Sequence, residues 1–100
     1  MMFIVLLTFA ENKAQAPELM AGHNAWLNQG FDDGVFLLAG SLQPKQGGAV
    51  WAHNCTREAL EQRVNQDPFV AETVVNAQIL EITPGKTDSR LAFLMDEVAA

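Results

Sequence analysis

A histidine stands in the middle of an amphipathic stretch, ELMAGHNAWL, at residues 18 to 27. At helical spacing, His23 falls on the apolar side of this stretch, which is the side that should be buried. That side also holds Leu19, Trp26 and Leu27, with Met20 at its edge. Imidazole changes charge near neutral pH, so His23 is a candidate general acid or base. The alternative is a core histidine that only hydrogen-bonds a backbone carbonyl.

Asp67 is the leading candidate for a partner of this histidine. It precedes Pro68 in NQDPFV, and an aspartate followed by proline is a common way to begin a helix. A capping role alone would account for it. The two roles are compatible, because one carboxylate oxygen can accept from helix N–H groups while the other faces a cleft and orients an imidazole.

Residues that could hold a ligand lie in other segments. Ser41 stands near the end of an apolar run, where its hydroxyl could donate to a substrate oxygen or simply complete a turn. Gly47 and Gly48 would let a ligand approach backbone N–H groups, although the pair lacks the pattern of a phosphate-binding loop. The candidates for an apolar wall are Trp26, Trp51 and Phe69.

The remaining titratable residues do not form a metal-binding pattern. His53 and Cys55 would point to one face of an extended segment, but two histidines and one cysteine lack the spacing of a zinc site. A Ser-His-Asp hydrolase is not indicated either, because no strained nucleophile turn or oxyanion hole can be recognised. We therefore expect a site without a metal or a cofactor.

Composition limits the classes of partner. The chain has 100 residues, enough for one domain, and a net charge of −6 that disfavours nucleic acid. A single cysteine, Cys55, rules out an internal disulfide and fits a cytoplasmic location. The apolar run at residues 1 to 7 is too short to span a membrane and follows no basic residue. A buried strand is therefore expected there, with neither a signal peptide nor a membrane partner.

Apolar runs and helical stripes alternate along the chain in the order β-α-β-β-α-β. Strands are predicted at residues 2–9, 35–42, 49–54 and 76–83. Helices are predicted from Pro17 to a C-cap at Gly30, and from an N-cap at Thr56 to residue 64. This order is typical of a ferredoxin-like α+β domain, a four-stranded antiparallel sheet with two helices on one face. The first strand is apolar on both faces, so a second copy of the sheet is the simplest cover for the other face.

The chain resembles the YCII-related proteins of the dimeric α+β barrel superfamily. The resemblance covers residues 2 to 84 and rests on several segments together. These are the N-terminal apolar strand, GHNAWLNQG with its histidine, LLAGSL and GGAVWA in the hairpin, TREALEQRV, and DPFV before the last strand.

The resemblance implies a ferredoxin-like protomer that pairs through its sheet into a dimer. It also implies a His–Asp pair as the active site, which falls on His23 and Asp67. Related activities include a dehydrochlorinase acting on a chlorinated hydroxyquinol, and the wider superfamily includes muconolactone isomerase and monooxygenases. We expect a YCII-like domain at residues 1–86 and a less typical tail at 87–100 that reaches a neighbouring subunit or supports a larger homo-oligomer.

Three functions are compatible with the sequence. The first is a cofactor-independent enzyme of lyase or isomerase type, in which His23 and Asp67 move a proton on a small oxygenated metabolite, aromatic or cyclic. In that enzyme Ser41 and Gly48 would hold a substrate oxygen, and Trp26 and Phe69 would form the apolar wall. The second is a module that binds a small molecule without converting it. The third is a purely structural oligomer.

Overall fold

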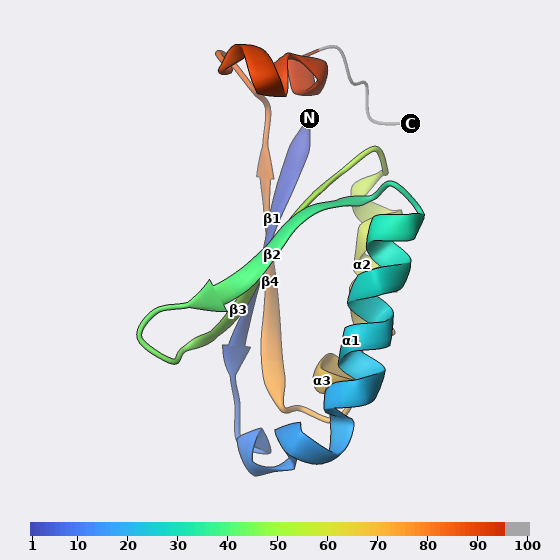
Figure 1. Ribbon diagram of the computed structural model, residues 1–100, viewed down its shortest axis with the longest axis vertical. Helices are drawn as coiled ribbons and strands as arrows, with labels where there is room; N and C mark the ends of the chain where they lie inside the picture. Colours follow the sequence, from blue (N-terminus) through green and yellow to red (C-terminus); the bar gives the residue numbers. More distant parts are fainter. Residues whose placement is uncertain (96–100) are drawn as a thin grey trace.

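The protein folds into an antiparallel sheet with helices packed against one face, as Figure 1 shows in a computed structural model that describes residues 1 to 95. The strands are β1 (Met2–Phe9), β2 (Phe36–Leu42), β3 (Gly47–His53) and β4 (Val75–Ile82). The helices are α1 (Ala16–Asp32), α2 (Arg57–Asn65) and α3 (Pro68–Ala71), with 3-10 segments η1 (Lys13–Gln15) and η2 (Ser89–Met95).

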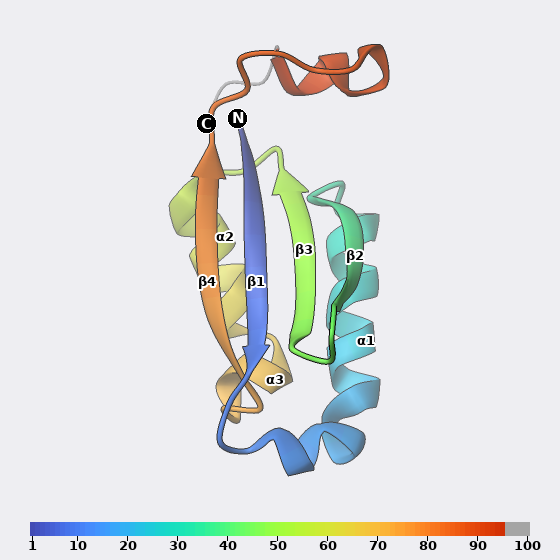
Figure 2. The ribbon, with the colours of Figure 1, turned by 90° about the vertical axis from the view of Figure 1, so that its left-hand side faces the viewer.

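The four strands lie in the order β2-β3-β1-β4, and every neighbouring pair is antiparallel (Figure 2). This is the strand order of a ferredoxin-like α+β domain, so the predicted fold class is confirmed. The observed ends of the four strands differ from the predicted ends by no more than two residues. The short loop between β2 and β3 makes the predicted antiparallel hairpin.

The core lies between the sheet and the helices. In β1 the side chains of Phe3, Val5 and Leu7 alternate toward this layer and are buried. Their partners across β3 include Val50 and Ala52, which are also buried. The remaining members of the core come from the helices, from the first residues of β2 and β4, and from the residues just before those two strands: Trp26, Val35, Phe36, Leu60, Val64, Phe69, Val74 and Val75.

The other face of the sheet carries large apolar side chains that remain partly exposed within residues 1 to 95. Leu38 is 45% exposed, Leu80 38% and Ile82 37%. The strand register places these three residues on the same side as Ile4 and Trp51, which are only half-buried. The apolar character of β1 on both sides, noted in the sequence, therefore corresponds to one buried face and one open face.

Helix α1 is longer than predicted, and the prediction that Gly30 caps it is wrong. The helix continues to Asp32, and Gly34, at φ +73°, supplies the left-handed residue that ends it. The N–H of Gly34 donates to the Phe31 carbonyl, and that of Val35 donates to the Gly30 carbonyl, at 3.0 Å each. Gly30 instead lies inside the helix. Glycine is needed at this position because a Cβ there would fall 2.1 Å from the ring of Phe36.

Helix α2 begins at the predicted N-cap. The hydroxyl of Thr56 accepts from the N–H of Ala59 at 3.0 Å, which starts α2.

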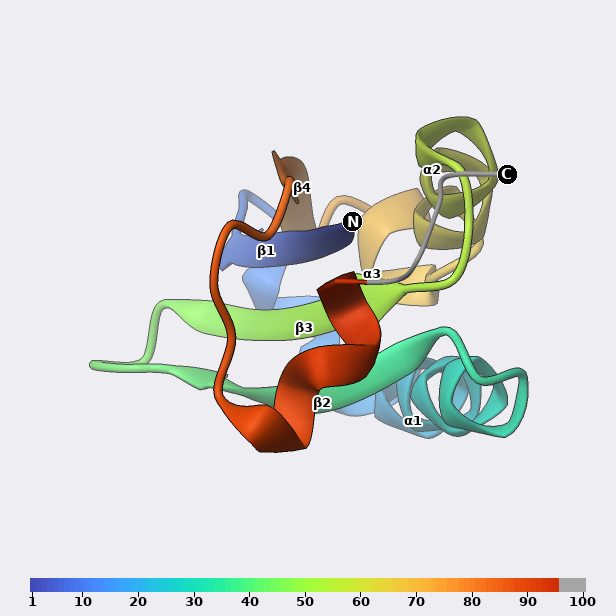
Figure 3. The same cartoon turned by 90° about the horizontal axis from the view of Figure 1, so that it is seen from above.

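Beyond β4 the chain crosses the end of the sheet and forms η2 (Figure 3), where Phe93 packs edge-on against His53 with ring centroids 5.5 Å apart. Residues 96–100 of the predicted tail lie outside the described residues. Within the described part, no helix is long and apolar enough to cross a membrane.

Candidate active site

A cavity of about 330 Å³ opens between helix α1 and the sheet. Its wall comes from α1, from the C-terminal half of β1, from the β2–β3 hairpin, and from Phe69 in α3. Most of the lining is apolar. The polar side chains in the wall are His23, Asn24 and Ser41, and no lysine, arginine, aspartate or glutamate among the described residues contributes to it.

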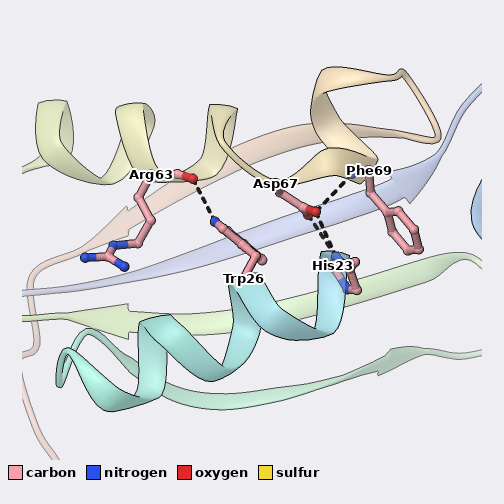
Figure 4. A network of polar contacts seen from close by, with 5 residues as sticks. All are labelled: His23, Trp26, Arg63, Asp67 and Phe69. Atoms are coloured by element: carbon pink, nitrogen blue, oxygen red, sulfur yellow. Dashed lines mark hydrogen bonds and ion pairs between the residues drawn. The ribbon is translucent and has the colours of Figure 1, made fainter. Parts of the chain in front are cut away.

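His23 reaches from α1 to Asp67, a residue 44 positions later in the chain (Figure 4). Its Nδ1 lies 2.9 Å from Oδ1 and 3.0 Å from Oδ2 of that carboxylate. An ionised carboxylate can only accept, so the imidazole donates from Nδ1 and carries its proton there in the neutral form. The other ring nitrogen, Nε2, makes no hydrogen bond within residues 1 to 95 and is the atom left to meet a ligand.

Asp67 is 0% exposed, and every hydrogen bond to its carboxylate within residues 1 to 95 comes from an N–H donor. Besides His23, its Oδ1 accepts from the backbone N–H of Phe69 at 3.0 Å, which makes it the N-cap of α3. Pro68 fills the first helical position, as the sequence predicted. One side chain thus both starts a helix and fixes the orientation of the imidazole, so the two readings of Asp67 hold together.

Aromatic rings hold the imidazole on its faces. Phe69 stacks on His23 with ring centroids 4.1 Å apart and an interplanar angle of 5°. Trp26, one helical turn along α1, lies 5.8 Å from His23 between centroids. A ring held in this way, and bonded through one nitrogen, has little rotational freedom, so its second nitrogen points in a defined direction.

Trp26 also ties α1 to the end of α2. Its indole N–H donates to the carbonyl of Arg63 at 2.8 Å (Figure 4), and the Arg63 guanidinium reaches back to Asp33 at 3.0 Å. Hydrogen bonds from Gln29 and then from Arg63 lower the pKa of Asp33, which keeps that exposed carboxylate ionised. These contacts fix the distance between α1, which carries His23, and the end of α2, which leads into Asp67.

Glycines let backbone elements approach near the site. A Cβ on Gly22 would lie 3.1 Å from the side chain of Pro68, so α1 passes close to the start of α3 just where His23 meets Asp67. At the opposite wall, Gly47 has φ +127°, and a Cβ there would overlap the carbonyl oxygen of Leu7. Gly48 faces the cavity beside Ser41, its partner in the β2–β3 ladder.

The structure brings together most of the residues that the sequence singled out. The cavity wall includes His23, Ser41, Gly48 and Phe69, with Asp67 directly behind the imidazole.

The predicted positions of two tryptophans need correction. Trp26 does not line the cavity. Its buried indole donates to the Arg63 carbonyl, and its ring stacks beside that of His23. Trp51 points to the open face of the sheet, since it neighbours the cavity-lining Val50 in β3 and successive strand residues face opposite sides.

One polar lining residue was missed in the sequence. Asn24 belongs to a second stripe of α1, formed with Met20, His23 and Leu27 at helical spacing, and all four line the cavity. The spacing i, i+3, i+4, i+7 was the signal that could have found it. Within the described chain, no three His, Cys, Asp or Glu side chains gather as they would around a metal ion.

The sequence matches the model of the YCII-related domain over residues 1–83. The chain belongs to the YCII-related domain family. This assignment agrees with the resemblance carried by the histidine segment, the hairpin and DPFV. No curated protein matches this YCII-related protein.

A solved structure similar to this YCII-related protein is 5-chloro-2-hydroxyhydroquinone dehydrochlorinase (TftG) from Burkholderia phenoliruptrix AC1100, in complex with 2,5-dihydroxybenzoquinone. The two share 13% sequence identity with a TM-score of 0.68, and the match covers 85% of this chain and 96% of that one. At this level of identity the similarity establishes the shared fold.

Proposed function

We propose that this protein is a small cofactor-independent enzyme that moves a proton on a small oxygenated metabolite, aromatic or cyclic, in a reaction of lyase or isomerase type. The observation that carries the proposal is the His23 imidazole in a cavity wall, bonded through Nδ1 to the buried carboxylate of Asp67. The structural similarity to a dehydrochlorinase with a bound dihydroxybenzoquinone supports the substrate class.

The chemistry follows from the tautomer. With its proton on Nδ1, neutral His23 takes a proton from the substrate at Nε2 and becomes an imidazolium, whose charge the Asp67 carboxylate balances. Return of the proton to another atom completes an isomerisation. Its delivery to a leaving group, or the departure of that group as an anion, completes an elimination. Ser41 and the backbone near Gly48 hold a substrate oxygen during these steps.

The proposal is tested by ligand binding and proton exchange together. Purified protein is titrated with 2,5-dihydroxybenzoquinone and with hydroxylated benzenes in a calorimeter, and the bound rings are then incubated in D₂O. We expect at least one ring to bind and to take up deuterium at carbon faster than it does without protein, as proton transfer requires. Binding without exchange or turnover would favour the non-catalytic binding module, and no binding at all would contradict both.

We further propose that the protein works as a homodimer or larger homo-oligomer in the cytoplasm. The open sheet face holds Leu38, Leu80 and Ile82, and a second copy of this face is a cover of matching apolar character. We assign residues 1–86 to the domain and 87–100 to a tail, and we propose that its described part, residues 87–95, extends this interface. Its Phe93, 42% exposed, packs on His53 of the same sheet face.

The assembly is checked by sedimentation at micromolar concentration. The wild-type protein is expected to sediment as a dimer or larger species, and Leu80→Arg is expected to shift it toward monomer, because a buried unpaired charge opposes association. Gln62→Arg, which places the same side chain on exposed α2, is the control. A wild-type monomer, or equal behaviour of the two variants, would contradict the interface.

A further inference from the structure

Helix α1 presents two different faces around His23. One face packs into the core through Trp26 and Gly30, and both are buried. The other lines the cavity through Met20, His23, Asn24 and Leu27. Asn24 is exposed in the protomer, so its amide can exchange bound water for a ligand that enters the cavity.

Two polar side chains of the cavity wall, both exposed to solvent, have no hydrogen-bond partner within residues 1 to 95. Within residues 1 to 95, neither the Asn24 amide nor the Ser41 hydroxyl hydrogen-bonds another protein group, whereas His23 is already bonded to Asp67. Asn24 follows His23 directly on α1, and Ser41 lies on β2. The cavity therefore offers a ligand three separate polar side chains, those of His23, Asn24 and Ser41.

We propose that Asn24 determines substrate specificity by hydrogen-bonding a second oxygen of the ring on which His23 acts. This inference rests on the proposed function and narrows its substrate class. An amide offers two donors and one acceptor, so it can hold either a hydroxyl or a carbonyl oxygen of the substrate. Since no lysine or arginine among residues 1 to 95 lines the cavity, we expect a neutral or singly anionic ligand rather than a phosphorylated metabolite.

The size of the cavity sets the scale of this ligand. A volume of about 330 Å³ is at the lower end of small-molecule sites. It fits a single oxygenated ring, whose faces the apolar wall covers and whose edge presents oxygens to the polar side chains. In this arrangement His23 supplies the chemistry, and Asn24 selects rings that carry an oxygen at a second position.

The test combines protein variants with a ligand series. Binding of 1,2,4-trihydroxybenzene, the three dihydroxybenzenes and phenol is measured by anaerobic calorimetry with wild type, Asn24→Leu and Asn24→Asp. Asn28→Asp is the matched control, because Asn28 lies one turn further on α1, is exposed and does not line the cavity. Turnover or deuterium exchange is measured in parallel with any ring that reacts.

Asn24→Leu is expected to weaken binding of the trihydroxybenzene about tenfold, the effect of losing one hydrogen bond to a ligand. The loss should fall below about twofold for the rings that lack the oxygen held by Asn24, since no contact is then removed. Asn24→Asp removes the donors, and it should weaken binding about tenfold or more when that oxygen accepts or is ionised. Asn28→Asp should leave all affinities within about twofold.

Equal losses for every ring, including phenol, would overturn the inference, because they would indicate a change in cavity shape. It would also fail if Asn24→Asp and Asn28→Asp behaved alike. In either case His23-dependent exchange by the variants would leave the proposed function standing. If wild type bound none of these rings, the proposed function would fail, and the role of Asn24 with it.

Discussion

Replacing His23 with alanine is expected to lower turnover or proton exchange by about 100-fold or more, the usual contribution of a positioned general acid or base. The substitution removes the side chain that the proposal makes the general acid or base of the cavity. Steady-state rates, or deuterium uptake by a bound ring, provide the measurement. Ligand binding should weaken much less, because the apolar wall and the contacts from Asn24 and Ser41 remain.

The same substitution should also reduce stability. Asp67 is fully buried, and without the imidazole its carboxylate keeps one backbone partner, the N–H of Phe69. Leaving a buried charge with too few partners costs about 1 to 3 kcal/mol or more, which urea unfolding can detect. If His23→Ala were instead more stable than wild type and equally active, the pair would have neither the catalytic nor the structural role assigned to it.

Asp67→Asn separates the two roles of the carboxylate. Asparagine is as good an N-cap as aspartate, so α3 should keep its first turn. A neutral amide cannot balance an imidazolium, however, and turnover should still fall by tenfold or more. A variant that keeps both its fold and its full activity would show that Asp67 acts as a cap alone.

The fold could be predicted from the sequence because local signals agree with one another. The polar breaks and the helical stripes separate the four strands from the two main helices, and caps such as Thr56 and the Asp67–Pro68 pair mark where helices begin. Strand ends moved by a residue or two because pairing extends or trims a strand beyond its apolar run. β3, for example, starts at Gly47, where the ladder to Thr8 and Leu42 begins.

The site could be predicted only in part. The sequence marks His23 and Asp67 as unusual, but their contact spans 44 positions and depends on how α1 packs against α3, so only the family resemblance placed them together. Trp26 and Trp51 were misplaced because an aromatic residue fits a core, a cavity wall or an open sheet face equally well. Asn24 was overlooked because α1 was read as having one apolar stripe, whereas its two faces serve the core and the cavity separately.

Gly30 shows how the same residue type can serve a different purpose from the one its position near a helix end suggests. A methyl group on Gly30 would lie between 2.1 and 2.7 Å from three atoms of the Phe36 ring. Phe36 is 4% exposed and packs edge-on against Trp26, with ring centroids 5.0 Å apart, so it has little room to move. The glycine is therefore required by packing between α1 and β2, and Gly34 is the residue required by backbone conformation.

Gly30→Ala is accordingly expected to destabilise the wild-type protein by about 1 to 3 kcal/mol, the cost of overpacking a core. In a Phe36→Ala background the ring atoms are gone, and the same substitution should become neutral or stabilising by up to about 1 kcal/mol, because alanine favours a helix more than glycine does. Urea unfolding of the four proteins in this cycle measures the change of sign. A loss of stability that persisted without the ring would mean that Gly30 is needed for its backbone conformation, as a helix cap would be.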